Sequence, residues 1–233
     1  SINGGVSLAN GANDRVVTST GASALTGEQY FTWNGNNLAL RGGQNQNCTI
    51  ELASDQGDSA ADFWRLMAQN SDNALAIDHY GSGSWVERLR IDSSGRLLLG
   101  GQSARTFGGG TYPHLQIEGL SEQAAHLTIT RVTNDTYGSV LGLAKSRGTS
   151  LGSNTIVQDN DTLGVIQFRG TDGSDIYSVA ASIHGEVDGS PSDGTDMPGA
   201  LVFGTTADGA SSPTERLRIA SDGKITVAAN GSI

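Results

Sequence analysis

Three clusters of acidic residues carry the side chains in this chain that could do chemistry. Paired carboxylates can hydrolyse a glycosidic bond as acid and base, and several together can hold a hard cation. None of the clusters has the spacing of a calcium loop, and each lies among polar turn residues. We therefore interpret them as polar turns, which we favour over a cation site or a catalytic pair. The clusters are Asp55, Asp58 and Asp62; Asp159 and Asp161; and Asp188, Asp193 and Asp196.

No other set of residues has a diagnostic catalytic spacing. The histidines (His79, His114, His126 and His184) are far apart, and no nucleophile elbow, phosphate-binding loop or dinucleotide fingerprint occurs. Cys48 is the single cysteine, which excludes an intrachain disulfide and a cysteine metal site. Tyrosines in polar segments could stack on sugar rings, although packing is the commoner role; these are Tyr112, Tyr137 and Tyr177. We expect no catalytic residues, no metal and no cofactor.

The secondary structure that positions these residues is formed by a chain whose composition favours turns. Of 233 residues, 33 are Gly and 36% are hydrophobic, and the net charge is -10. This charge repels phosphate, so nucleic acid is not an expected partner. The longest apolar runs, 74–77 and 200–203, are far shorter than the roughly 18 residues of a membrane span, so we expect no membrane insertion.

Turn signals and two-residue apolar spacing predict an all-β fold. Pairs such as Ile50 and Leu52 alternate as in half-buried strands. The segment Ser59–Gln69 has mixed periodicity and we interpret it as a strand, whereas Leu120–Leu127 fits strand and helix equally. Asn-Gly and Asp-Gly dipeptides, typical of tight hairpin turns, begin at Asn3, Asn10, Asn34, Asp172, Asp188, Asp193, Asp208, Asp222 and Asn230.

A repeat separated by 128 positions is the strongest internal signal. Ser84–Leu99 (SWVERLRIDSSGRLLL) matches Ser212–Val227 (SPTERLRIASDGKITV) at eight of sixteen positions. Each copy predicts a hairpin, with Glu, Leu and Ile on one strand face and both Arg on the other. The same offset aligns Leu75 with Phe203, so a three-stranded meander is expected at the end of each half.

The duplicated Glu and Arg residues are the candidate structural or interface residues. We predict Arg–Glu pairs across strands or between chains, because Arg suits paired and interface sites. A solvated face or a ligand role is the alternative. The turn glycines are included because tight turns need positive φ. The candidates are Glu87, Arg88, Arg90, Gly95, Glu215, Arg216, Arg218 and Gly223.

A glycine-rich stretch, Gly100–Gly110, marks the predicted boundary between two β modules. The modules are residues 1–103 and 104–233. Their few large apolar residues give each a thin core, and their strands leave exposed edges. Self-association would supply both missing partners and further burial.

The chain resembles bacteriophage tail-fibre and related virion fibre proteins. The resemblance rests on ERLRIDSSGRLLLGG, on Lys145–Asp175 and on Asp196–Ile225, and less specifically on the strand-turn-strand unit of Ala24–Leu40. It implies elongated, intertwined homotrimers of β modules. Many such fibres end in a self-cleaving intramolecular chaperone, which the resemblance would place after Ile233.

The resemblance implies a non-enzymatic virion fibre, assembled in the bacterial cytoplasm, that attaches the particle to the host surface. Expected partners are further copies of the chain, other tail or baseplate proteins, and a host surface glycan or protein receptor. Whether it is shaft or tip, and which receptor-binding residues it uses, are left open. Two alternatives also remain, a polysaccharide depolymerase tailspike and a bacterial surface adhesin.

Overall fold

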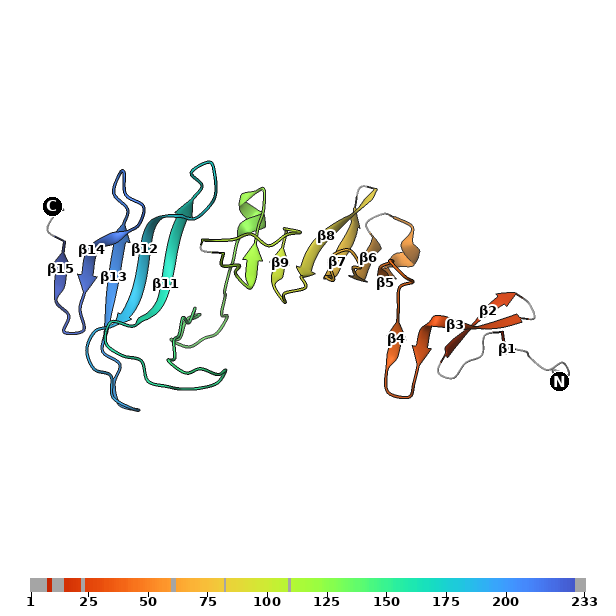
Figure 1. The fold of residues 1–233 in the computed structure, drawn as a ribbon, viewed down its shortest axis with the longest axis horizontal. Coiled ribbons are helices and arrows are strands. Elements are labelled where there is room, and N and C mark those ends of the chain that lie inside the picture. Colours follow the sequence, from red (N-terminus) through yellow and green to blue (C-terminus); the bar gives the residue numbers. More distant parts are fainter. Residues whose placement is uncertain are drawn as a thin grey trace. The chain divides into compact units, whose positions relative to one another are not determined.

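The computed structural model describes residues 8–9, 15–21, 24–59, 62–81, 83–108 and 110–228. These residues form an all-β structure, as predicted (Figure 1). The helical segments described are short 3-10 turns, η1 (Asp55–Gly57) and η3 (Glu122–Ala125). Within the described part of the chain, no helix is long and apolar enough to cross a membrane. The turns predicted at Asn3, Asn10 and Asn230 lie outside the described residues.

The chain divides into two compact units. The first comprises Ser1–Arg105 and Tyr112–His126, and the second comprises Thr106–Thr111 and Leu127–Ile233. The strands described in the first unit are β1 (Leu8–Ala9), β2 (Arg15–Gly21), β3 (Ala24–Trp33), β4 (Leu38–Leu40), β5 (Cys48–Ala53), β6 (Phe63–Ala68), β7 (Leu75–Gly81), β8 (Ser84–Ile91), β9 (Leu97–Leu99) and β10 (Leu115–Ile117). Those of the second are β11 (Thr162–Gly170), β12 (Ser178–Val187), β13 (Gly199–Thr205), β14 (Thr214–Ile219) and β15 (Ile225–Val227).

Strands β1 to β4 form a four-stranded sheet, in which β3 pairs with β1, β2 and β4. The strand-turn-strand unit expected within Ala24–Leu40 is confirmed by the antiparallel pair β3–β4. At its turn, Asn34 Oδ1 accepts hydrogen bonds from the N–H groups of Asn36 and Asn37. Gly35 adopts φ +92°, a conformation that Gly reaches without steric strain.

Strands β5 to β10 form a six-stranded sheet in chain order. The pairs from β5 to β9 are antiparallel, and β10 is parallel to β9. The strand predicted within Ser59–Gln69 is confirmed as β6. The segment Leu120–Leu127, which the sequence left ambiguous, contains η3.

One face of this six-stranded sheet is apolar and open to solvent in the single chain. Leu52, Leu115 and Trp64 are 62%, 53% and 43% exposed. Paired residues share a face, so the registers place two apolar rows across all six strands. The rows, here called the first apolar face, are Cys48, Ala68, Leu75, Ile91, Leu97 and Leu115, and Ile50, Leu66, Ile77, Leu89, Leu99 and Ile117.

The opposite face is buried although it carries polar groups. Asp78, Arg90 and Gln116 are 2%, 6% and 5% exposed and lie beside Ala76 and Leu98. A sheet in a soluble monomer commonly turns its apolar face inward and its polar face to water. This sheet therefore has the reverse arrangement.

Strands β11 to β15 form an antiparallel five-stranded sheet, again in chain order. It also leaves one apolar face exposed, with Phe168, Ile166 and Ile225 at 54%, 46% and 64%. The buried face is centred on Val202 and Ala200. The rows of the second apolar face are Ile166, Ile183, Phe203, Leu217 and Val227, and Leu201, Ile219 and Ile225.

Candidate functional site

The two repeat copies form equivalent hairpins, β8–β9 and β14–β15, and both contain a β-bulge. In β8 the register advances by two residues while β7 advances by one, which leaves Arg88 as the extra residue. Strand β14 has the same irregularity at Arg216, the corresponding residue of the second copy. The three-stranded meanders expected at β7–β9 and β13–β15 are confirmed.

Because of the bulge, the assignment of side chains to strand faces that the sequence predicted for the repeat is wrong. Strict alternation placed Glu87 with Leu89 and Ile91, and both arginines on the other face. This is wrong because the extra residue at the bulge shifts the alternation by one position. Glu87 instead shares the buried polar face with Arg90, so both of these charges are removed from the first apolar face.

The alignment of the preceding strand also needs correction. Phe203 pairs with Leu217 in the second unit, and Ile77 pairs with Leu89 in the first. Ile77 is therefore the structural counterpart of Phe203, where the sequence offset predicted Leu75. The reason is that the chain between the paired positions is two residues longer in the second copy.

Arg90 is the centre of a buried network. Its Nε donates to Glu87 Oε1 at 2.6 Å, and its Nη2 donates to Gln69 Oε1 at 2.8 Å. Asp72 accepts a further hydrogen bond from Nη1. The side chains of Arg90 and Glu87 are only 7% and 6% exposed. Pairing with Glu87 raises the pKa of Arg90 above its ordinary value, against the opposing effect of burial, so this guanidinium is a permanently charged structural anchor.

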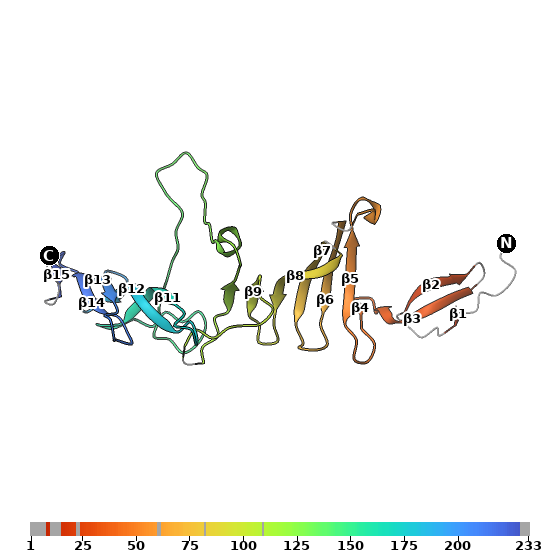
Figure 2. The same cartoon turned by 90° about the horizontal axis from the view of Figure 1, so that it is seen from above.

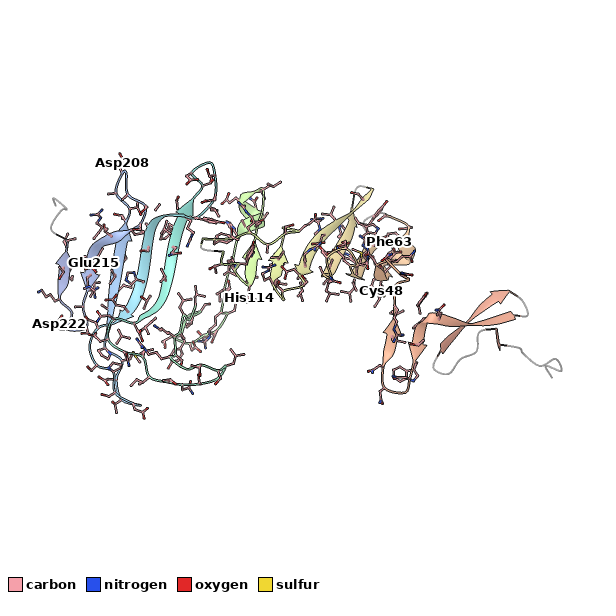
Figure 3. All side chains as sticks on the ribbon, viewed as in Figure 1. Cys48, Phe63, His114, Asp208, Glu215 and Asp222 are labelled. Atoms are coloured by element: carbon pink, nitrogen blue, oxygen red, sulfur yellow. The ribbon has the colours of Figure 1, made fainter. Side chains whose placement is uncertain are left out.

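Arg218 is held in the same way in the second unit. Its Nη2 lies 2.9 Å from Glu215 Oε2, and its Nη1 lies 2.5 Å from Glu186 Oε1. Pairing first with Glu215 and then with Glu186 raises the pKa of Arg218. The second copy thus reproduces the pairing of the Arg with the Glu three positions before it, and Glu186 of β12 adds a second acidic partner; Asp188 Oδ1 lies farther away, 4.0 Å from Nη1. Figure 3 labels Glu215 on β14.

The remaining candidates of the repeat lie at its surface. Arg88 is exposed at the bulge, and Arg216 donates from Nε to Thr205 Oγ1 at 2.9 Å. Gly95 and Gly223 occupy the hairpin turns with φ of +77° and +81°, which explains why both copies keep Gly there.

A second buried pair in the first unit carried no signal in the sequence. Arg65 Nε donates to Asp78 Oδ2 at 2.6 Å, and the Arg65 guanidinium lies 4.5 Å from the centre of the Trp85 ring. These residues come from β6, β7 and β8 and meet only through the sheet register. In the sequence, nothing distinguishes Asp78, which is buried on β7, from the acids of the turns.

The acidic clusters lie in turns, where they accept hydrogen bonds. Asp62 Oδ2 accepts from the Ser59 N–H at 2.9 Å, and Asp196 Oδ1 accepts from the Ser192 N–H at 2.8 Å. Asp188 Oδ2 accepts from the Ser221 N–H at 2.7 Å, which lowers its pKa. Among the described residues, no group of three or more His, Cys, Asp or Glu is arranged to hold a metal.

Asp161 differs from the other acids because it is buried and fully paired. It accepts hydrogen bonds from Arg147 Nε at 2.6 Å and Lys145 Nζ at 2.8 Å, and from the Gln158 N–H at 2.9 Å. These bonds, that of Arg147 foremost, hold the pKa of Asp161 far below its ordinary value. Asp161 therefore anchors the irregular chain before β11 and is not available as a proton donor near neutral pH.

The tyrosines considered as sugar platforms already have contacts within the chain. The Arg96 guanidinium lies 4.7 Å from the Tyr112 ring centre, and that of Arg131 lies 5.7 Å from the Tyr137 ring centre. Tyr177 hydrogen-bonds through its hydroxyl to Thr106. Of the histidines, His184 lies 3.5 Å from Glu186, and His79 packs on Trp64 with ring centres 4.7 Å apart.

An open groove of about 490 Å³ lies in the second unit. Lys145, Asp193 and Asp196 give it charge of both signs, and Met197 and Ile156 add apolar surface. A lining that combines apolar side chains with hydrogen-bond donors and acceptors is the kind that a small polar ligand needs. The groove thus brings Asp193 and Asp196, two of the three acids of the third cluster, together with Lys145.

Comparison with known proteins places the fold among phage tail-fibre domains. The chain is similar over 100% of its length to the carboxy-terminal domain of the bacteriophage T5 L-shaped tail fibre, with a TM-score of 0.53, 16% identity and 90% of that chain covered. It is also similar to the structure of that domain with its intra-molecular chaperone domain, with a TM-score of 0.54, 15% identity and 62% of that chain covered. The chain thus spans less than two thirds of the second structure.

At these identities the likeness concerns the fold, and at that level it confirms the resemblance read from the sequence. No family model and no curated protein sequence matches the chain.

Proposed function

We propose that this chain is a non-enzymatic structural fibre of a phage virion, that it acts as a homotrimer, and that it attaches the particle to the host cell surface. Its partners are then two further copies of itself, other virion tail or baseplate proteins, and a surface glycan or protein receptor. It would assemble in the host cytoplasm before incorporation into the particle.

The observation that carries this proposal is the pair of exposed apolar faces. Contiguous apolar surface of this kind marks an association site in soluble proteins. Leu52 at 62%, Phe168 at 54% and Ile225 at 64% exposure are examples from both sheets. Three copies that turn these faces toward a common axis would bury them all, which gives each module the core that its own chain lacks.

The charge distribution supports the same arrangement. Each bulge turns one Glu away from the apolar face to the side of the Arg that it pairs with, and both Arg anchors are satisfied inside their own chain. Copies of a chain with net charge -10 repel one another, so a largely apolar interface limits what is added to that repulsion. The tail-fibre fold of the two similar structures agrees with a fibre role.

The molar mass in solution tests the assembly. Light scattering over a hundredfold concentration range should give about three times the 24.0 kDa of one chain. A well-folded monomer at every concentration would contradict the trimer.

Binding and chemistry are tested together on host surface polysaccharide. The assembled protein is incubated with capsule or lipopolysaccharide from a susceptible host, and both retention and new reducing ends are measured. Retention without cleavage supports the proposal. Cleavage that disappears when Asp55, Asp58 or Asp62 is changed to Asn would instead establish a depolymerase.

A further inference from the structure

Residues 127–146 form a long extended segment, here called the arm, that precedes β11. Within the described chain, the main-chain groups of the arm make no hydrogen bond to another main-chain group. Its internal contacts gather at one bend, where Asp135 accepts from Arg131 Nη2 at 2.5 Å and from the Tyr137 N–H at 2.9 Å. Figure 2 shows the chain after η3 as an open loop whose two limbs do not pair.

The two limbs of the arm have the side-chain pattern of strands. Leu127 and Ile129 alternate with threonines in the first limb and are 66% and 51% exposed. Leu141 and Leu143 alternate in the second limb and are 63% and 49% exposed. Two-residue apolar spacing with β-branched neighbours is typical of a strand that is half covered. The arm therefore has the sequence of strands but lacks their partners.

The cost of ordering the arm favours a partner outside the chain that would supply burial and main-chain hydrogen bonds. Fixing the backbone of each residue costs about 1–2 kcal/mol, and burial and hydrogen bonds must offset it. Among the described residues, hydrogen bonds join the arm to the rest of its chain only near its end, where Lys145 donates to Asp161 and Ser146 Oγ donates to the Thr155 carbonyl. Before that point, the described residues of the limbs gain no main-chain bonds from their own chain, and their leucines and isoleucine stay about half or more exposed.

We propose that the arm forms main-chain hydrogen bonds with an edge strand of a neighbouring copy of this chain. The inference rests on the proposed self-assembly and specifies one contact of it. Strands β11 and β15 are the edges of their sheet, and an uncovered edge is a row of free donors and acceptors. The nine residues of β11 contain neither Pro nor Lys, the residues that commonly protect an edge.

Two features favour a second copy as the occupant. The end of the arm is continuous with the second apolar face, because Leu143 packs over Gly164 of β11 so closely that a Cβ there would overlap it. The charged residues of its central part, Arg131 and Asp135, pair with each other, so the two limbs add no net charge to an acidic partner. Lys145 at the end of the arm pairs with Asp161 of its own chain.

The length of the arm is sufficient for the exchange. The shorter limb, before the bend at Asp135, has about eight residues, and extended chain advances about 3.3 Å per residue. A limb therefore reaches about 26 Å, whereas packed sheets lie only about 10 Å apart. The arm can cross from its own sheet to that of a neighbour.

Hydrogen exchange in the assembled full-length protein tests the inference. We expect amides of residues 128–133 and 138–143 to exchange at least tenfold more slowly than those of the exposed connection 207–209. Thr130→Pro removes one donor from the first limb and should abolish this protection, whereas Thr130→Ala keeps the donor and should retain it. Exchange of the limbs at the rate of unstructured peptide, in a protein that scatters light as an oligomer, would overturn the arm exchange and leave the proposed fibre intact. A monomeric protein would overturn both.

The neighbour is identified by a photoreactive benzoyl-phenylalanine in place of Thr130. Irradiation of the assembled protein should give a covalent species of twice the chain mass, with peptides of β11 or β15 attached to the arm. Crosslinks confined to single chains in an assembled protein would overturn the exchange.

Discussion

Glu87 and Arg90 lie on the same face of β8, with Glu87 Oε1 accepting a hydrogen bond from Arg90 Nε at 2.6 Å. Residues three positions apart in a regular strand point to opposite faces, and the bulge at Arg88 reverses this. Glu215 and Arg218 repeat the relationship across the bulge at Arg216. The duplicated sequence therefore encodes a bulge together with the ion pair that it makes possible.

Removing the two glutamates should have unequal effects. Glu87→Ala leaves the buried Arg90 with Asp72 as its remaining acidic partner and should lower the free energy of unfolding by about 1.5–3 kcal/mol, the contribution of a hydrogen bond to a charged group. Glu215→Ala should cost about 0–1 kcal/mol, because Glu215 and Arg218 are 38% and 25% exposed and water replaces the lost partner. Urea unfolding followed by tryptophan fluorescence measures the first change, since all three tryptophans belong to the first unit. Far-UV circular dichroism measures the second, and equal losses would contradict the prediction.

The turn glycine of the first hairpin should tolerate Asn but not Val. Gly95→Val forces a β-branched residue to φ +77° and should cost about 1–2 kcal/mol. Gly95→Asn should cost much less, because Asn adopts positive φ more readily. A Cβ at Gly95 meets no atom within 4 Å, so crowding does not contribute to the difference. The urea midpoint of each variant measures it, and indistinguishable midpoints would argue against a conformational role for Gly95.

Acid should weaken the second unit through Asp161. Its pKa in the folded chain is depressed, so the unfolded state binds the proton more readily and protonation favours unfolding. The stabilisation is present above the ordinary pKa of about 3.8 and is lost as the pH falls below it. Asp161→Asn should be less stable than the unaltered chain at pH 7, with the gap narrowing toward pH 3. Circular dichroism melts at both pH values measure the gap, and a constant gap would rule out this linkage.

Two neighbouring residues on β11 provide a matched test of the second apolar face. Phe168→Glu places a charge on that face and forfeits about 1.5–3 kcal/mol of side-chain burial per chain in the assembly. Gln167→Glu adds the same charge to the exposed opposite side of the same strand. We expect the first variant to shift the molar mass in light scattering toward the single chain, and the second to assemble normally. Equal behaviour would mean that the face is not buried between copies.

Much of the fold could be predicted because it depends on local patterns. The turn after Asn34 and the strand within Ser59–Gln69 follow from turn chemistry and apolar alternation. The repeat predicted both hairpins, including the positive φ of Gly95 and Gly223. These features need no information about distant parts of the chain.

The polar networks could not be predicted because they depend on register and on long-range pairing. The letters ERLRI alternate equally well with or without a bulge, so the face of Glu87 was assigned wrongly. Asp161 meets Lys145 and Arg147 through irregular chain, to which no periodicity applies. Apart from the buried Asp161, the acids that the sequence emphasised lie in exposed or half-buried turns, whereas the buried Asp78 received no emphasis.

The strand order of the two larger sheets has a consequence for the kinetics of assembly. In both sheets the order in space follows the order in the chain, so every contact that closes them joins segments close in sequence. Such low contact order allows rapid folding of each sheet within one chain, before any second chain arrives. The newly folded chain then exposes its apolar faces to solvent. In this state aggregation competes with correct association. If the chain assembles as proposed, the rate at which chains meet, set by their local concentration during synthesis, should therefore limit the yield of the assembled protein more than the folding of the chain itself.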